Sequence, residues 1–370
     1  MRVVLATHYA LPHTGGIEVV VDAVSRRLAA RGHEVAVVAC AAAARPGEEL
    51  RDGVRVVRVR AYNGAERRLG APYPVFSPAL LRVLRRELAG ADVVHAHGFL
   101  YQSSAAALAM APRGAARVLT EHVGHVAYAP RALDAAESAA IATVGRAAAR
   151  RAQAHVVYNA TVAELLARLA PRRRTAWIVN GVDGERFRPA ADDAERARLR
   201  ASFGWDERPR VLFAGRPVAK KGFDVALDAA QRGGFALAVA GAPGGVHGAE
   251  SLRLLAPERM AEAYRAADVL LVPSHGEGLP LVVQEALASG LPVVVSDDPG
   301  YRDTLRAGSP GVVLVPRDAA AMAAAVGELL SSPARRAEAA AVAAGFARRA
   351  FSWTHAADEH EALYRELLRR

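Results

Sequence analysis

The sequence lacks the features of a secreted, disulfide-bonded protein and of a membrane-spanning protein. A single cysteine, Cys40, excludes an internal disulfide framework and is typical of a reducing environment. No apolar run approaches the roughly 18 residues that span a bilayer, and MRVVLATHYALP has too short an apolar core for a secretory signal. Aromatic residues make up 6% of the chain, which argues against a surface built for stacking nucleic-acid bases. We therefore predict a cytoplasmic protein.

Lysine is also nearly absent. Of the 48 basic residues, 46 are arginine, and the only lysines are the neighbours Lys220 and Lys221 in the run FAGRPVAKKGFD. We interpret this as a chemical demand for a compact, mobile ammonium group in one loop. The alternative is that two lysines share an exposed turn by chance.

The excess positive charge is confined to the first half of the chain. Residues 1–186 contain 25 Lys and Arg against 15 Asp and Glu, whereas residues 187–370 contain 23 of each. This asymmetry suggests an acidic partner for the first half: a lipid surface, a phosphorylated acceptor or nucleic acid. A coding bias toward arginine is the alternative, but it does not explain the asymmetry.

Strand-like and helix-like runs alternate along the chain, and the pattern restarts once. RVVLAT, EVAVVAC and ADVVHAH belong to the first set, and RVLFAG, ALAVAG, DVLLVPS and PVVVSD follow after WIVNGVDGERFRP. Continuous apolar strands that alternate with helices predict parallel sheets covered on both faces. The predicted fold class is therefore α/β, with two doubly wound domains at residues 1–184 and 185–350. The ligand site is expected in a cleft between them, at the carboxyl ends of the strands.

A nicotinamide-dependent dehydrogenase does not fit this pattern. The first strand is followed by THYALPHTGG rather than a G-x-G-x-x-G turn, and EVAVVAC ends without an acidic residue for a ribose. The later run GAPGG, residues 241–245, is only a partial match.

The run SHGEGLPLVVQEALASG contains two glutamates, and one of them lies among apolar residues. A helix is predicted over residues 281–288, after Pro280 and before Gly290, and Glu285 is its only charged residue. Apolar residues surround Glu285 on every helical face, so its carboxylate needs a partner. Glu277 lies in the glycine-flanked loop just upstream.

Taken together, these motifs resemble the retaining glycosyltransferases of family 4, which have the GT-B fold. The resemblance is carried by GGIE, NGVD, GR with KG, YRAADVLLVPS, EGLPLVVQEALASGLPVV and the closing FSWTHAADEHEALYRELL. It implies two Rossmann-like domains facing each other across a cleft, with residues 351–370 returning to the first domain. It also implies transfer of a hexosyl-type sugar from a nucleotide sugar, such as a UDP- or GDP-sugar, to an acceptor hydroxyl, without a metal or other cofactor.

The resemblance further implies roles for individual residues. Glu285 would accept hydrogen bonds from the ribose hydroxyls and Glu277 from the donor sugar, while Arg216 and Lys221 would stabilise the diphosphate. The implied catalytic residues are His122, Glu277, Arg216 and Lys221. The implied donor-binding residues are Gly15, Gly16, Arg216, Lys221, Gly241, Leu254, Glu277, Gly278, Leu279, Pro280 and Glu285. The run at Pro299–Gly300 and Asp303 departs from the family pattern, so no role is assigned there.

Each of these roles has a plainer alternative. Glu277 would offset the dipole at a helix N-terminus, Glu285 would pair with a buried arginine, and His122 would be a buried histidine bonded to backbone. His95 and His97 are expected on opposite faces of a strand, and His122 and His125 lack an H-E-x-x-H frame, so no metal site is predicted.

The function and the partners also have alternatives. A GT-B-fold epimerase or inverting transferase is one, and a basic nucleic-acid- or sugar-nucleotide-binding protein without catalysis is another. The predicted partners are a nucleotide sugar and a lipid-linked or small-molecule acceptor sugar, with no nucleic acid. Residues 62–88, with Leu80, Leu81, Leu84 and Leu88 along one helical face, are a candidate contact with an anionic membrane at the inner face of the cell membrane. The same pattern is typical of a helix that packs on a sheet.

Overall fold

The chain forms two compact units. A computed structural model describes residues 1–13, 15–42, 44–64, 66, 73–124, 131–300, 302, 304–305 and 309–369. Unit 1 consists of Met1–Val179 and Trp353–Arg370, and unit 2 of Asn180–Ser352. The predicted ranges were 1–184 with 351–370, and 185–350, so the observed boundaries lie at Val179 and Ser352 instead.

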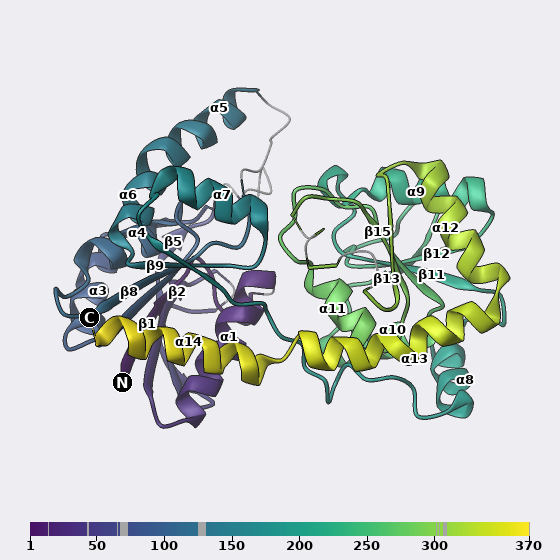
Figure 1. The fold of residues 1–370 in the computed structure, drawn as a ribbon, viewed down its shortest axis with the longest axis horizontal. Coiled ribbons are helices and arrows are strands. Elements are labelled where there is room, and N and C mark those ends of the chain that lie inside the picture. The colour runs from purple at the N-terminus through teal and green to yellow at the C-terminus, as the bar shows by residue number, and fades with distance from the viewer. Residues whose placement is uncertain are drawn as a thin grey trace. The chain divides into compact units, whose positions relative to one another are not determined.

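Unit 1 contains an eight-stranded sheet in the order β10-β9-β8-β7-β1-β2-β4-β3. Figure 1 shows part of this sheet, with β1, β2, β8 and β9 labelled. Its neighbouring strands are parallel except for β3 and β4. The strands are β1 (Arg2–Ala6), β2 (Glu34–Cys40), β3 (Gly47–Arg51), β4 (Val54–Val59), β7 (Val93–His97), β8 (Ala116–Thr120), β9 (Ala154–Val157) and β10 (Arg174–Trp177). A separate antiparallel pair joins β5 (Ala61–Tyr62) to β6 (Val75–Phe76). The apolar runs seen in the sequence become the inner strands, because both faces of a parallel sheet are buried.

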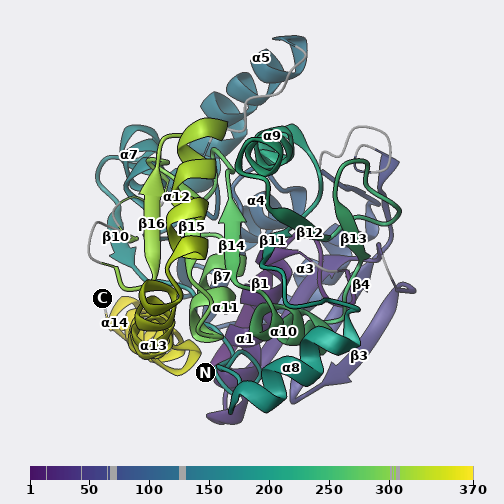
Figure 2. The same ribbon diagram turned by 90° about the vertical axis from the view of Figure 1, so that its right-hand side faces the viewer.

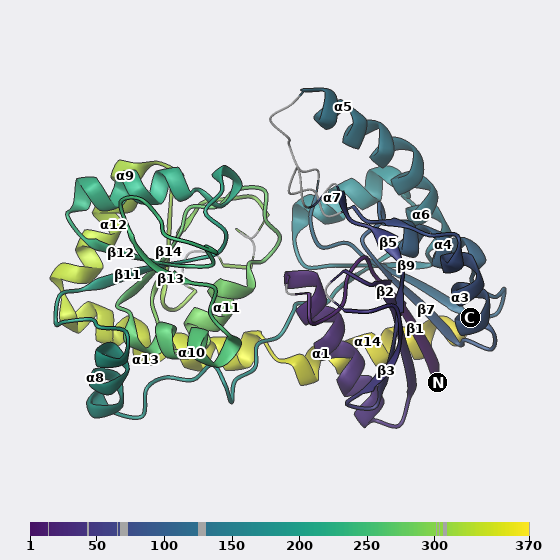
Figure 3. The same cartoon turned by 180° about the vertical axis from the view of Figure 1, so that it is seen from behind.

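Helices cover both faces of this sheet. The helices of unit 1 are α1 (Gly16–Ala30), α3 (Ala79–Leu88), α4 (Gln102–Met110), α5 (Arg131–Ala140), the π-helix η1 (Ile141–Gly145), α6 (Arg146–Arg151), α7 (Ala160–Leu169) and α14 (Trp353–Leu368). On one face α1 and α14 lie side by side (Figures 1 and 3), and Leu363 and Tyr364 of α14 join the core around Val3 and Leu5. The return of residues 351–370 to the first domain is therefore confirmed for α14.

The other face explains the amphipathic pattern of residues 79–88. Leu80, Leu84 and Leu88 of α3 are all buried in the core that α3 and α4 form with the sheet. Of the four leucines on α3, only Leu81 is exposed. The apolar face that made this segment a candidate membrane contact is therefore used for internal packing.

Unit 2 contains a six-stranded, fully parallel sheet in the order β13-β12-β11-β14-β15-β16 (Figure 2). Its strands are β11 (Arg210–Ala214), β12 (Ala236–Ala240), β13 (Glu250–Arg253), β14 (Val269–Val272), β15 (Val293–Ser296) and β16 (Val312–Val315). Its helices are α8 (Asp193–Ser202), the 3-10 turn η2 (Ala219–Lys221), α9 (Phe223–Gly233), α10 (Pro257–Ala266), α11 (Leu281–Ala288), α12 (Ala319–Ser331) and α13 (Pro333–Ala350). Because α9 and α12 pack against one face and α11 against the other, each unit is doubly wound, as predicted.

None of the helices in the described part of the chain combines the length and the apolar character that a membrane span requires.

Candidate functional site

The two glutamates of the sequence motif lie where β14 meets α11. The helix predicted over residues 281–288 is confirmed, with Pro280 at its N-cap. Glu285 is partly buried, and its Oε2 accepts a hydrogen bond of 2.9 Å from the hydroxyl of Tyr264, a buried residue of α10. The partner of Glu285 is thus a tyrosine rather than the arginine considered from the sequence.

The carboxylate of Glu285 can accept further hydrogen bonds. Burial raises the pKa of its carboxyl to about 7, although the Tyr264 hydrogen bond and the nearby Arg186 act in the opposite direction. Near pH 7 the carboxylate is therefore only partly stabilised by its protein partners. A ligand diol that donates two hydrogen bonds would favour the ionised form.

Glu277 and Lys221 form an ion pair. The Nζ of Lys221 lies 3.0 Å from Oε1 of Glu277, and the two side chains are 30% and 12% exposed. Lys221 ends the short η2 turn after β11, while Glu277 follows the neighbouring strand β14. The structure thus brings together a predicted phosphate ligand and a predicted sugar ligand, 56 positions apart in the numbering, at adjacent strand ends.

Backbone contacts hold these two loops together. Gly222 has a φ of +70°, and a Cβ there would lie 2.0 Å from the carbonyl oxygen of Pro273. The backbone N–H of His275 donates to the carbonyl of Lys220 at 3.1 Å. Arg317 donates from Nε to Pro273 O at 2.8 Å and from a terminal nitrogen to Ala219 O at 3.0 Å. These bonds set the position of the η2 turn relative to the loop that carries Glu277.

Asp298 orients the Glu277 loop from the end of the next strand, β15. Its Oδ2 accepts from the backbone N–H of Gly276 at 2.8 Å, and its Oδ1 accepts from Gly300 at 2.7 Å. A Cβ on Gly300 would lie 1.9 Å from the carbonyl oxygen of Glu277, so the two backbones are in close contact. Sequence reasoning missed Asp298, although an aspartate two residues after a buried strand was a usable signal. Tyr301 and Asp303 lie outside the described residues.

The remaining predicted residues of unit 2 also lie at strand ends. Arg216 follows β11, is exposed, and forms no ion pair with any residue that the structure describes. Gly241 follows β12 with a φ of +117°, and a Cβ there would lie 2.5 Å from the carbonyl oxygen of Gly215. Leu254 follows β13 and is 68% exposed. The run Gly278, Leu279 and Pro280 is buried where the loop enters α11.

In unit 1, the predicted glycines begin the first helix. Gly15 is the N-cap of α1 and Gly16 is its first residue. A Cβ on Gly15 would lie 2.3 Å from Oε2 of Glu18, a buried carboxylate of the same helix turn. Glu18 in turn lies 3.3 Å from Nδ1 of His13. Burial lowers the pKa of His13, but the Glu18 and Glu66 carboxylates outweigh that effect, and the net shift is upward. The helix N-terminus therefore already has a carboxylate and an imidazole beside it.

His122 belongs to a buried group of histidines at the carboxyl ends of β7 and β8. Its Nε2 lies 3.0 Å from Nδ1 of His97, and the His97 and His95 ring centroids are 4.3 Å apart. The prediction that His95 and His97 point to opposite faces was wrong, because residues two apart in a strand share a face. Burial lowers the pKa of His122 to about 3, so its ring is neutral at pH 7.

These histidines are held by polar side chains. His95 lies 2.6 Å from the Tyr364 hydroxyl of α14 and 2.7 Å from the Thr120 hydroxyl. His125 lies outside the described residues. Among the residues the structure describes, no three His, Cys, Asp or Glu side chains are grouped so that they could hold a metal ion.

Glu121 is a further residue that sequence reasoning did not assign. Its Oε2 accepts from the backbone N–H of Phe99 at 2.8 Å, and its Oε1 accepts from that of His122 at 3.1 Å. Burial raises the pKa of this carboxyl to about 7. Glu121 thus ties the end of β7 to the end of β8 and positions the backbone of His122.

Comparisons with known proteins agree for both units. Residues 14–186 match the family described as Glycosyltransferase Family 4, and residues 195–344 match Glycosyl transferases group 1. A D-inositol 3-phosphate glycosyltransferase 1 from Catenulispora acidiphila is 35% identical over 96% of this chain and 91% of its own length. A D-inositol 3-phosphate glycosyltransferase from Geodermatophilus obscurus is 34% identical over 95% of this chain and 84% of its own.

Solved structures resemble the whole chain. The sucrose-phosphate synthase of Thermosynechococcus elongatus matches with a TM-score of 0.80 at 22% identity, over 99% of this chain and 98% of that one. Anabaena HepE in complex with UDP-glucose matches with a TM-score of 0.72 at 17% identity, over 98% of this chain and 99% of that one. At such identities these two matches describe the fold.

Proposed function

The chain belongs to glycosyltransferase family 4 and has the GT-B fold, and from this premise we propose that it transfers a hexosyl-type sugar from a nucleoside diphosphate donor to an acceptor hydroxyl with retention. The observation that carries the proposal is the arrangement in unit 2. A lysine–glutamate ion pair lies in the loop before α11, and a tyrosine-bonded glutamate lies within that helix. The arrangement supplies one cation and two carboxylate acceptors around the connection from β14 to α11.

The carboxylates of Glu285 and Glu277 would bind the donor, because their partners within the protein compete only weakly with it. Glu285 has one neutral hydroxyl partner, so ribose hydroxyls would add charge-assisted hydrogen bonds of roughly 1.5–3 kcal/mol. Glu277 has one ammonium partner, Lys221. When a diphosphate pairs with Lys221, the carboxylate of Glu277 would be free to accept hydrogen bonds from the sugar hydroxyls.

The chemical step would break the bond between the anomeric carbon and the β-phosphate oxygen. The acceptor oxygen forms the new bond to the same carbon from the same face, and its proton passes to the departing phosphate. The nucleoside diphosphate then leaves with the electron pair of the broken bond. Lys221 and Arg216 would stabilise the charge that develops on the phosphate, which is where a fixed cation accelerates the step most.

We propose that no metal ion takes part in this step. The support is that Lys221 is held by the backbone contacts of the η2 turn and that Arg216 is exposed without an ion pair among the described residues. His122 would face the reacting carbon as a neutral imidazole, and Gly15 and Gly16 would donate backbone N–H groups to the diphosphate.

The acceptor is proposed from the relatives. Curated relatives about a third identical over nearly the whole chain are named for D-inositol 3-phosphate. A phosphorylated cyclitol is therefore the first acceptor to assay. A phosphorylated acceptor also fits the excess of arginine in the first half of the chain.

The proposal is tested in two stages with the full-length protein. UDP-, GDP- and ADP-sugars are first compared for the rise in melting temperature that they cause, and the active donor is then incubated with D-inositol 3-phosphate in excess EDTA. We expect one nucleotide class to bind and to give a product with the anomeric configuration of the donor. Glu285→Gln should lose the donor response. Glu262→Gln, which makes the same charge change on α10 at a residue that pairs with Arg259, should keep it.

Three results would contradict the proposal. Absence of any nucleotide-sugar response would remove donor binding, and full dependence on a divalent cation would remove the metal-free step. An inverted product would leave the family in place and refute retention.

A further inference from the structure

Six arginines of unit 1 stand out because they lie in a segment of the chain that contains almost no carboxylates. Residues 141–179 contain seven arginines and a single acidic residue, Glu164. One of the seven, Arg174, pairs with Glu366 of α14. The other six are exposed and form no ion pair with the residues that the structure describes: Arg146, Arg150, Arg151, Arg168, Arg172 and Arg173. We call these six the arginine surface.

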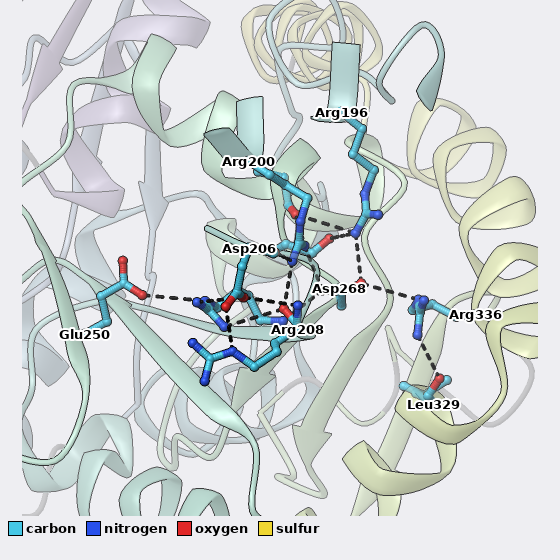
Figure 4. Close-up of polar contacts among 11 residues, drawn as sticks. Arg196, Arg200, Asp206, Arg208, Glu250, Asp268, Leu329 and Arg336 are labelled. Atoms are coloured by element: carbon cyan, nitrogen blue, oxygen red, sulfur yellow. Dashed lines mark hydrogen bonds and ion pairs between the residues drawn. The ribbon is translucent and has the colours of Figure 1, made fainter. Parts of the chain in front are cut away.

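Several arginines elsewhere in the protein are neutralised by nearby carboxylates. In unit 2, Arg196, Arg200 and Arg336 surround Asp268 (Figure 4), at 2.8, 3.0 and 3.6 Å from its carboxylate. In unit 1, Arg55 lies 2.7 Å from Glu87. A general coding bias toward arginine does not explain why residues 141–179 contain seven arginines and only one acidic residue. The arginine surface is therefore expected to bind an anion from outside the chain.

The arginine surface is contiguous. Arg146 and Arg150 lie one turn apart on α6. The guanidinium of Arg173, in the segment after α7, donates to the backbone carbonyl of Arg150 and joins the two segments. The run Arg172–Arg174 lines a pocket of about 450 Å³ together with Gln153, Pro171 and Leu367.

This surface lies away from the histidines of the candidate site. The 172–174 run precedes and begins β10, and Gln153 precedes β9, so the pocket lies at the amino-terminal ends of these strands. His97 and His122 lie at the carboxyl ends of β7 and β8, parallel neighbours in the same sheet. An anion bound by the arginine surface would therefore leave that edge of unit 1 open.

Two exposed apolar side chains lie in the same part of the chain as the arginines. Trp177, the last residue of the edge strand β10 that Arg174 begins, is 52% exposed, and Val144, two residues before Arg146, is 43% exposed. The indole ring of tryptophan is favoured at the boundary between water and lipid headgroups, because one part of it is apolar and its N–H is polar. The charge and the exposed apolar groups together match a lipid interface.

We propose that the arginine surface binds the headgroups of an anionic membrane. Its charges are spread along α6, at the end of α7 and in the run before β10, rather than converging on one small anion. A nucleic acid would need several stacking aromatics, and the surface offers only Trp177. This site goes beyond the proposed glycosyl transfer, and it differs from α3, whose Leu80, Leu84 and Leu88 are buried.

The test is flotation of the full-length protein with phosphatidylcholine vesicles that contain or lack phosphatidylglycerol. The variant R146Q/R168Q/R172Q removes three charges whose side chains form no hydrogen bond or ion pair with the described residues, so the fold should be kept. We expect it to lower binding to the anionic vesicles on the order of 100-fold. The matched control R82Q/R85Q/R198Q removes the same charge from exposed arginines elsewhere, and it should bind close to wild type.

Fluorescence provides a second readout that needs no variant. Trp205 and Trp353 are both only 5% exposed, so a change in emission on adding vesicles reports mainly on Trp177. We expect a shift to shorter wavelength with anionic vesicles that is reversed by salt, because the Debye length falls below 10 Å above 0.1 M ionic strength.

Several outcomes would overturn the inference. They are equal binding to neutral vesicles, an equal loss in the control variant, and binding to duplex DNA without binding to vesicles. Unchanged Trp emission with the anionic vesicles would also overturn it.

Discussion

Replacing Glu285 by glutamine is expected to stabilise the unliganded protein above pH 7 while it weakens donor binding. Burial raises the pKa of this carboxyl from 4.5 to about 7. The folded state therefore holds the proton more tightly than the unfolded chain. The contribution of Glu285 to stability is fully present below pH 4.5 and is lost as the pH rises through 7.

The size of the effect follows from the same shift. At about 1.4 kcal/mol per pH unit, ionising Glu285 in its folded site costs on the order of 3 kcal/mol above pH 7. Glutamine keeps an oxygen acceptor for the Tyr264 hydroxyl and carries no charge. For a unit of this size we expect a melting temperature on the order of 5–10 °C higher than wild type at pH 8, with the difference vanishing toward pH 4.5.

The same Glu285→Gln substitution that raises the melting temperature should lower the affinity for the donor. Loss of charge-assisted hydrogen bonds of about 1.5–3 kcal/mol corresponds to roughly 10- to 150-fold weaker binding of the nucleotide sugar. For the wild type, affinity should also weaken as the pH falls below 7, because a protonated carboxyl accepts fewer hydrogen bonds from the ribose. Melting curves from pH 4.5 to 8 and calorimetric titration of the donor measure the two effects separately.

The two measurements can refute the reasoning independently. A Glu285→Gln protein that melts below wild type at pH 8 would show that the carboxylate stabilises the folded state. A variant that binds the donor as tightly as wild type would show that Glu285 does not contact the ribose. Glu262→Gln on α10 controls for the change of charge alone.

The remaining predictions concern the phosphate side and unit 1. Lys221→Ala should lower kcat on the order of 10²–10³-fold with a smaller effect on binding of the bare nucleoside. Lys221→Arg should rescue it poorly, and Lys220→Ala should be tolerated, so an active Lys221→Ala enzyme would contradict the assignment. Asp298→Asn places an amide NH₂ against one of two backbone N–H donors, and steady-state kinetics should show transfer about tenfold slower with nearly unchanged binding of the free nucleotide. His97→Ala removes the ring that contacts His122 and should lower kcat with little change in donor KM. Because the pKa of His122 is lowered, its contribution to stability is present above pH 6.5 and is lost as the pH falls, so wild-type thermal melts should show unit 1 weakening below pH 6.5.

The sequence by itself determined the elements whose signals are local. Long apolar runs predicted β1, β2, β7, β11, β12, β14 and β15, because a strand buried on both faces of a parallel sheet must be apolar throughout. The helix at 281–288 was predicted to the residue, since a proline and a glycine mark its two ends. The order of the family motifs along the chain then identified the fold class.

Three of the strands at the edges of the sheets were decided only by tertiary structure. The strands β3, β10 and β13 are short and polar, as in GEELR, RTAW and ESLR, and none was predicted. An edge strand is covered on fewer sides, so its residues need not be apolar, and pairing with a neighbour alone makes it a strand. The pattern of α3 fits a lipid surface and a sheet surface equally, and only the packed core shows which one Leu80 contacts.

The contacts of the candidate site residues could not be predicted from the sequence either. Tyr264 reaches Glu285 from another helix, Lys221 reaches Glu277 from another strand end, and Asp298 holds the Glu277 loop from a third. Each pair is separated by at least 21 positions, and side-chain spacing along one element carries no information across such a distance. The sequence thus determined which residue types are present at which strand ends, and the order of strands in the sheet decided which of them touch, because the carboxyl ends of adjacent parallel strands meet along one edge.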